Sequence, residues 1–199
     1  MLPIGPLMKE HRLIEKMLAH VREAVDCARR QGEIDPLFVD QVLDFIRTYA
    51  DRTHHGKEED ILFRELGRKN LRREHARLME ELIAEHTQGR RMVHRLADAL
   101  KRFREGDAVS GETILSALDG LAALYPAHIE KEDRAFFIPV MDYFDEAERA
   151  AMLEEMARFD ERMIQEKYAR MVEELGKRAV TAMAGGEELS VRGALHPGI

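Results

Sequence analysis

Four long stretches of this sequence place apolar residues three and four positions apart, the spacing of one buried face of an α-helix. The first stripe covers residues 7–28, and Gly32 ends it. Similar stripes cover residues 39–61, 71–103 and 114–135, with short connections between them. Long helices joined by short connections pack as antiparallel bundles. The pattern therefore predicts an all-α fold, an antiparallel up-down four-helix bundle with an additional C-terminal helical segment.

The predicted bundle takes up only part of the 199 residues. We expect residues 1–141 to form the four-helix bundle. Residues 142–182 are expected to form a C-terminal helical extension that packs on it, because Asp145-Glu-Ala-Glu148 has the arrangement of a capping box and apolar residues follow at helical spacing. Residues 183–199 contain glycines and lack periodicity, which predicts a flexible tail.

Three local features refine the helix boundaries. Asp35-Pro36 predicts a helix start, with Asp as the N-cap and Pro in the first helical position. Pro126 lies inside the fourth stripe, where it should kink the helix or free the carbonyl of Ala122. Gly56 lies inside the second stripe, where a missing side chain permits the close approach of a neighbouring helix.

Composition excludes several classes of function. A net charge of −7 argues against general binding of nucleic acid. The single cysteine, Cys27, cannot form an internal disulfide, which fits a reducing cytoplasm. The N-terminus lacks the apolar core of a signal peptide, and no apolar run is long enough to span a membrane. We therefore expect a cytoplasmic protein without a membrane partner. The Met-rich C-terminal segment leaves homodimer formation open.

Polar residues interrupt the second and fourth stripes with the same pattern. His54 and Glu58 are four residues apart and so share a helix face, and His128 and Glu132 repeat that spacing. The residues around the two pairs also correspond: Lys57 with Lys131, Glu59 with Asp133, and Phe63 with Phe137. The chain therefore contains one His/Glu cassette twice.

The first and third stripes each contribute a histidine at a core position. These are His11 and His86, and a glutamate precedes each of them. In an antiparallel hairpin, residues equidistant from the turn lie at the same height. This relation places His11 beside the first cassette and His86 beside the second, whereas His75 falls farther away. We therefore expect one polar layer inside an apolar bundle.

This layer has the donor atoms of a metal site: His11, His54, Glu58, His86, His128 and Glu132. A lone inward histidine is more often a core residue than a ligand, but two buried carboxylates cost several kcal/mol each unless something compensates them. Bound cations provide that compensation. Six ligands exceed a tetrahedral zinc site and suit two metal ions bridged by carboxylates and by an oxo or hydroxo group. Mixed nitrogen and oxygen donors with about two open positions fit iron best and manganese second.

The sequence resembles the hemerythrin-like, or HHE cation-binding, family over about residues 6–140. The resemblance implies a four-helix bundle around a non-haem di-iron site that binds O2, NO or peroxide for sensing, storage or scavenging. Oxygen-carrying members have His-x-x-x-His on the third helix, whereas this chain has Arg90 at the second position. That difference removes an imidazole from one iron, opens a coordination position and argues against reversible O2 carriage.

Two other functions stay open from the sequence. The same iron pair could act as a peroxidase or oxidase, which would need an external electron donor. The protein could instead donate iron in iron homeostasis or in iron–sulfur cluster repair. Repair proteins of this type usually carry a Cys-containing N-terminal region, which this sequence lacks, so we rank that role lower. Whether the protein turns over a substrate is left open.

Four further residues are candidates around the site. Glu15 is either a third carboxylate ligand or a surface charge, and Arg90 is placed to pair with a carboxylate near the ligands. Tyr125 either donates a hydrogen bond to a bound small ligand or only packs, and Tyr168 is a candidate for the mouth of the site. His55 points about 100° away from His54 on an α-helix, so we expect it to be exposed.

Overall fold

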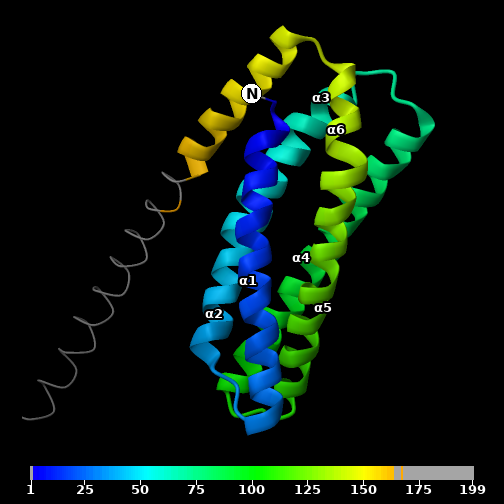
Figure 1. The fold of residues 1–199 in the computed structure, drawn as a ribbon. Coiled ribbons are helices and arrows are strands. Elements are labelled where there is room, and N and C mark those ends of the chain that lie inside the picture. The colour runs from blue at the N-terminus through cyan, green and yellow to red at the C-terminus, as the bar shows by residue number, and fades with distance from the viewer. Residues whose placement is uncertain (1, 164–166, 168–199) are drawn as a thin grey trace, which may run out of the picture. The chain divides into compact units, whose positions relative to one another are not determined.

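The computed structural model describes residues 2–163 and 167, and within these residues the regular structure is entirely helical. The chain up to Phe159 forms one compact unit, and the chain from Asp160 forms another. The fold described below is that of the first unit. It is the expected all-α bundle of long helices (Figure 1).

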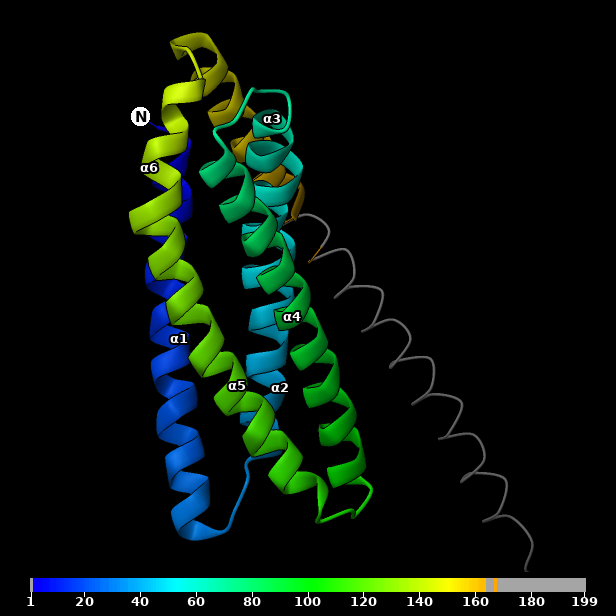
Figure 2. The same cartoon turned by 90° about the vertical axis from the view of Figure 1, so that its right-hand side faces the viewer.

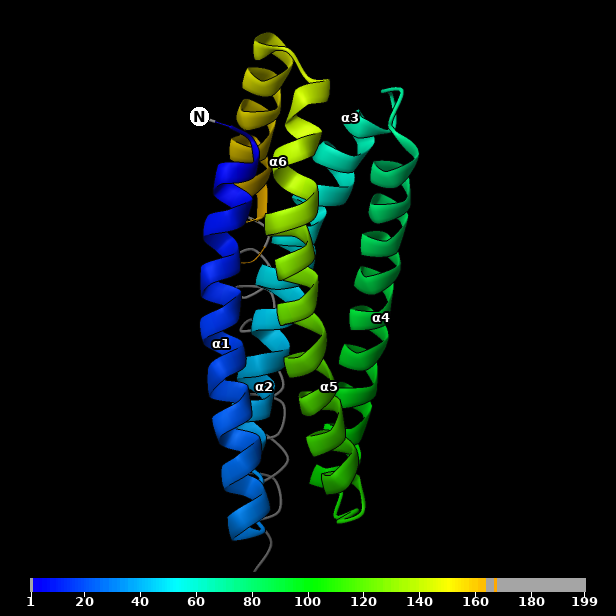
Figure 3. The same ribbon diagram turned by 45° about the vertical axis from the view of Figure 1, so that its right-hand side comes forward.

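The helices of this unit form four rods, residues 4–31, 36–66, 73–104 and 110–140. The rods run antiparallel (Figures 1 and 2). The first rod is α1, and α5 packs against both α1 and α4 (Figure 3). Two of the rods combine α-helix with π-helix, in which backbone hydrogen bonds skip one residue more than in an α-helix. In chain order the elements are α1 (Ile4–Gln31), α2 (Pro36–Phe45), the π-helices η1 (Ile46–His55) and η2 (Glu58–Phe63), α3 (Arg64–Leu66), α4 (Arg73–Arg104), α5 (Ser110–Lys131), the π-helix η3 (Glu132–Phe136), α6 (Phe137–Val140) and the 3-10 helix η4 (Met141–Tyr143).

The first connection has the predicted local chemistry. Gly32 ends α1 in the left-handed conformation, with φ of 74°, and its N–H donates to the carbonyl of Ala28. Asp35 begins α2, and its side chain accepts a hydrogen bond of 2.9 Å from the N–H of Leu37. Pro36 occupies the first helical position. These contacts confirm the predicted helix end and helix start.

Pro126 frees the carbonyl of Ala122, as its sequence position predicts. The proline lies within α5 and cannot donate to the residue one turn before it. Arg22 on α1 takes up that carbonyl, with Nη2 donating to the Ala122 oxygen at 2.6 Å. The contact joins α1 to α5 at the point where the α5 backbone ladder is interrupted.

Residues 146–159, which belong to the same compact unit, are helical again and bury Met152, Met156 and Phe159. Asp145 and Glu148 form the predicted capping box, each side chain accepting from the other residue's backbone N–H. Phe159 is buried, and a Cβ added at Gly56 would lie 2.7 Å from its Cζ. The close approach predicted at Gly56 is therefore confirmed. The domain divisions at 141 and 182 stay predictions, and the tail, 183–199, lies outside the described residues.

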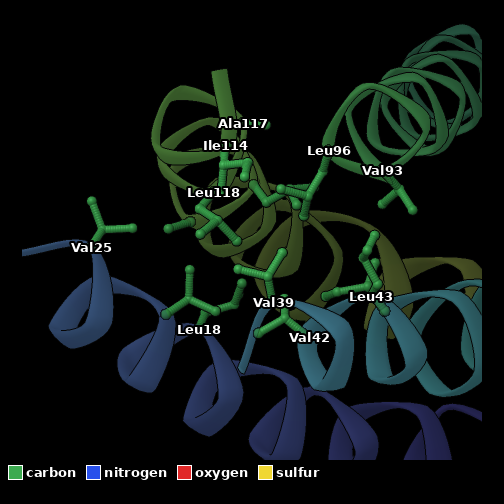
Figure 4. Packing of buried hydrophobic residues seen from close by; sticks show 14 of the residues in the cluster. Leu18, Val25, Val39, Val42, Leu43, Val93, Leu96, Ile114, Ala117 and Leu118 are labelled. Atoms are coloured by element: carbon green, nitrogen blue, oxygen red, sulfur yellow. The ribbon is translucent and has the colours of Figure 1, made fainter. Parts of the chain in front are cut away.

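Apolar layers lie on both sides of the polar residues. On one side, Leu18, Val39, Leu96 and Leu118 belong to a large cluster built from all four rods (Figure 4). On the other side, one helical turn beyond the polar residues, four fully buried apolar side chains follow: Leu7, Leu62, Leu82 and Phe136. The polar layer is thus enclosed along the bundle axis by close-packed side chains that exclude water.

Candidate metal centre

The six predicted ligand residues lie together in one buried layer. All four rods contribute to it. Within each cassette, the i, i+4 spacing keeps the His and the Glu on one helix face. Every member is at most 4% exposed: His11, His54, Glu58, His86, His128 and Glu132.

The four imidazoles form two pairs. Nε2 of His11 lies 2.9 Å from Nε2 of His54, and Nε2 of His86 lies 3.1 Å from Nε2 of His128. In each pair the two Nε2 atoms face each other. Such an arrangement is expected when both nitrogens face one bound cation.

The two carboxylates connect these pairs. Glu58 places Oε1 3.2 Å from Nε2 of His54 and Oε2 3.4 Å from Nε2 of His86. Glu132 places Oε2 3.2 Å from Nε2 of His11 and 3.3 Å from Nε2 of His128. Despite these distances, none of the four carboxylate oxygens has a hydrogen-bond partner among the described residues. Each carboxylate therefore reaches both imidazole pairs with lone pairs that no hydrogen bond uses.

A second carboxylate holds the outer nitrogen of each imidazole in the first pair. Nδ1 of His11 lies 2.8 Å from Asp133 Oδ1, and Nδ1 of His54 lies 2.9 Å from Glu10 Oε2. Arg12 pairs with Asp133, and the fully buried Lys57 pairs with Glu10. In the neutral imidazole, a carboxylate on Nδ1 keeps the single proton there, so that Nε2 can bind a metal.

The second pair repeats this arrangement. Nδ1 of His86 lies 2.7 Å from Glu59 Oε1, and Nδ1 of His128 lies 2.8 Å from Glu85 Oε2. Lys131 pairs with Glu85 at 2.5 Å. The acidic and basic residues that the repeated cassette shares thus have a physical role, because they orient the imidazoles and balance the charge of the outer carboxylates.

The phenylalanine of each cassette stacks on the lone histidine of the other half of the repeat. Phe137 stacks on His11, with ring centroids 5.6 Å apart and planes 6° apart. Phe63 stacks on His86 at 6.0 Å and 10°. Each phenylalanine restricts the ring orientation of one imidazole and shields it from water.

As long as no metal is bound, the layer lowers the pKa of both carboxylates and raises the pKa of three imidazoles, those of His11, His54 and His128. Burial by itself lowers the pKa of His54, but Glu58 and Glu10 more than offset burial and raise it to about 10. Burial opposes Glu132 in the same way at His128, where the pKa also rises to about 10. Burial raises the pKa of Glu58, but His54 outweighs it and lowers that pKa to about 2. Protons therefore take the place that metal cations would occupy.

His55 corrects one prediction from the sequence. We expected it to be exposed, but it is 3% exposed and stacks on His86 with centroids 3.8 Å apart. His55 is the last residue of the π-helix η1, and its ring lies against His86 on α4, whereas the ring of His54 lies against His11 on α1. The doubled histidine next to a cassette was the only signal in the sequence, and an α-helical periodicity hides it.

The other predicted residues lie around the layer rather than in it. Arg90 donates from Nε to Asp51 at 2.8 Å and from Nη2 to Glu59 at 2.7 Å, so it pairs with the carboxylate that holds His86. Glu15 pairs with Arg12 at 2.9 Å near the surface.

Tyr125 and His75 also lie outside the set of donor residues. Tyr125 is buried and stacks on His55, with planes 7° apart. His75 lies elsewhere, where its Nε2 is 3.1 Å from Arg72. Tyr168 falls outside the described residues.

The donor atoms form two groups that could each hold one ion. His11, His54, Glu58 and Glu132 place one donor atom each within 4.8 Å of one another, and His55, Glu58, His86 and His128 do the same. Glu58 belongs to both groups. The residues present therefore fit a pair of metal ions that share a carboxylate.

Comparison with protein families agrees with this geometry. The family model for the hemerythrin HHE cation-binding domain matches residues 2–138, which is more than half of the chain. The chain belongs to the hemerythrin HHE cation-binding domain family. No curated protein and no solved structure matches it significantly. Over the described residues, each helix is too short or too polar to cross a membrane.

Proposed function

We propose that this protein holds two iron ions in the polar layer and binds O2, NO or peroxide there, for sensing, storage or scavenging. The observation that carries the proposal is the set of four buried carboxylate oxygens on Glu58 and Glu132, which face four Nε2 atoms without a hydrogen bond. A buried carboxylate without a hydrogen bond is costly, and bound metal cations would offset that cost, as protonated imidazoles do when no metal is bound. Membership of the HHE family supports the same reading.

Iron is the best match to the donor set, and manganese is second. Imidazole donors suit iron, whereas carboxylate donors suit manganese and magnesium. A site that offers both types of donor therefore fits a redox-active ion, with iron first and manganese second. A structural zinc site would be closed and four-coordinate, which does not explain a carboxylate shared between two groups. When bound, the iron pair supplies a redox-active centre with open positions for small molecules.

The chain's own residues prepare this centre. Glu10, Glu59, Glu85 and Asp133 each accept a hydrogen bond from an Nδ1–H, which fixes the tautomer of every imidazole. Close-packed apolar layers on both sides exclude bulk water and limit access to small molecules. The proposed function needs no organic substrate pocket at the layer.

Gas and peroxide binding test the proposal. The protein is loaded with Fe(II) under argon and then exposed separately to O2, NO and hydrogen peroxide, while the optical spectrum is recorded. We expect a saturable spectral change with at least one of them and no sustained consumption of an added reductant. Failure to take up iron would overturn the metal proposal. Sustained peroxide or O2 consumption with a reductant would instead favour a peroxidase or oxidase.

Matched variants locate the response. His86→Ala removes a residue of the layer, and His75→Ala removes a buried histidine on the same helix that lies outside it. We expect His86→Ala to lose iron and the spectral change, while His75→Ala keeps both. The reverse result would place the site elsewhere on α4.

A further inference from the structure

Among the described residues, His55 is the one buried histidine next to the layer that the repeated cassette does not explain. It lies inside a stack of four nearly parallel rings. Tyr125 is 5.9 Å from it on one side and His86 is 3.8 Å from it on the other, and Phe63 follows beyond His86. The stack fixes the place of the ring without using its nitrogens.

The nitrogens of His55 are weakly engaged for so buried a ring. Nδ1 is 3.4 Å from Oδ1 of Asp51, at the long limit of a hydrogen bond, and that oxygen already accepts from Arg90. Nε2 is buried and has no hydrogen-bond partner among the described residues. A ring nitrogen of His55 lies within 4.8 Å of donor atoms on Glu58, His86 and His128. An unpartnered imidazole nitrogen in that position is a metal donor.

We propose that His55 is a third imidazole ligand of the metal ion held by His86 and His128. This inference rests on the proposed function, because it concerns the same metal pair. It names a ligand that neither the repeated cassette nor the family match assigns. The two ions then differ, one with three imidazoles and the other with two.

The position of Arg90 supports the assignment. Its side chain turns away from the layer to Asp51 and Glu59, so α4 supplies no second imidazole. His55 reaches the same metal from η1, on a different rod. In the second cassette the matching position is Ile129, which is buried and apolar. The second cassette therefore has no imidazole at the position where the first cassette has His55.

The structure offers room for the ring to adjust. The planes of His55 and His86 differ by only 14°, so one of the two rings must rotate before both nitrogens can point at one ion. A cavity of about 50 Å³ borders His55, Arg90 and Tyr125, next to these rings.

The assignment changes where a small molecule binds. Both carboxylates reach both imidazole pairs, so the third imidazole fills a position on the His86/His128 ion that stays open on the His11/His54 ion. We therefore expect the exogenous ligand to bind the His11/His54 ion. From the sequence alone, we expected the open coordination position beside Arg90 instead.

Mössbauer spectroscopy of the full chain loaded with ⁵⁷Fe tests the assignment. The wild type should show two quadrupole doublets of equal area, because the two irons have different ligands. His55→Phe keeps a ring in the stack but removes both nitrogens. In this variant we expect one doublet to move toward the other while the second stays in place. Spectra of the wild type and of His55→Phe that coincide would overturn the assignment.

Two further measurements separate ligation from packing. In His55→Ala, added imidazole should restore the wild-type doublet, because the free ligand can enter the space left by the side chain. No restoration, together with a wild-type spectrum in His55→Phe, would show that His55 only packs.

His75→Ala is the matched control, since His75 is also buried with one unpartnered ring nitrogen, and its spectrum should equal that of the wild type. Wild-type protein that takes up no iron would contradict the proposed function itself, and that result is separate from any effect of His55.

Discussion

Protons and metal ions compete for the same nitrogen lone pairs in the polar layer. Without metal, the charged carboxylates of Glu58 and Glu132 raise the pKa values of His54 and His128 to about 10, although burial opposes this. A metal ligand must be the neutral imidazole. Metal uptake is therefore coupled to proton release at these two residues.

This coupling predicts a pH dependence with a definite sign. At pH 7.5 both His54 and His128 are protonated in the metal-free protein, so uptake of the metal pair should release about two protons from them. The apparent affinity should increase as pH rises from 7.5 toward 10. Calorimetry in buffers of different ionisation enthalpy measures the released protons. An affinity that does not change over this range, with no proton release, would contradict the account.

The carboxylates that accept hydrogen bonds from Nδ1 of the ligand histidines can be compared between the two halves of the repeat. Glu10 holds His54 and pairs with Lys57, and Glu85 holds His128 and pairs with Lys131. Glu10→Gln and Glu85→Gln should each weaken metal affinity by roughly 10- to 100-fold, because the imidazole loses its anionic partner. Competition with a chelator of known affinity measures this effect.

The same two variants should differ in stability. Lys57 is fully buried, so replacing the charge of its partner Glu10 should lower the free energy of unfolding by about 1–3 kcal/mol. Lys131 is partly exposed, so Glu85→Gln should cost less than about 1 kcal/mol. Urea unfolding of the metal-free proteins checks the difference. Equal losses would contradict the role given to the buried lysine.

At the level of elements, the π-helices decide what the sequence could reveal. Periods of three and four residues correctly predict four helical rods and the positions of His11 and His86. They cannot show that η1 is π-helical, because hydrogen-bond register leaves no direct mark in the side-chain pattern. His55 was therefore predicted to be exposed, and that prediction was wrong. π-Helical segments often occur at functional sites, and here η1, η2 and η3 border or include the cassettes.

Gly56 links the second rod to the C-terminal helical segment. An α-helical propensity scale predicts that Gly56→Ala stabilises the protein by about 1 kcal/mol. The structure predicts the opposite, because the new Cβ would lie 2.7 Å from Cζ of Phe159. We expect a net loss of about 1–3 kcal/mol in the free energy of unfolding.

A double-mutant cycle tests the cause of that loss. Phe159→Ala removes the obstructing ring, so adding Gly56→Ala to it should cost little or increase stability. Thermal unfolding of the two single variants and the double variant gives the coupling. Additive effects would show that the two residues do not touch in solution.

For the molecule as a whole, the duplicated cassette explains why the site was largely predictable. Two His/Glu pairs and two lone histidines, reflected through short turns, are enough to place six residues in one layer. Reflection cannot reveal departures from the repeat, because it treats both halves as equal. His55 and Ile129 occupy matching positions and differ in chemistry, and only the three-dimensional structure shows that both are buried.

Long-range contacts were beyond the sequence for a different reason. Arg22 binds the carbonyl that Pro126 frees, and Phe159 fills the space above Gly56. Each contact joins residues about 100 positions apart, and nothing local specifies the partner. The sequence predicted a free carbonyl at Ala122 and a close approach at Gly56, and the fold supplies Arg22 and Phe159 as the partners.

The metal content of purified protein tests the central claim most directly. The protein is loaded with Fe(II) under argon, freed of excess metal and measured by mass spectrometry of the elements, beside Glu58→Gln and His75→Ala. We predict about two iron ions per chain in the wild type and in His75→Ala, and a large loss in Glu58→Gln, because Glu58 reaches both imidazole pairs. A wild type that binds a single zinc ion or no metal, or a Glu58→Gln variant that keeps both irons, would contradict the account.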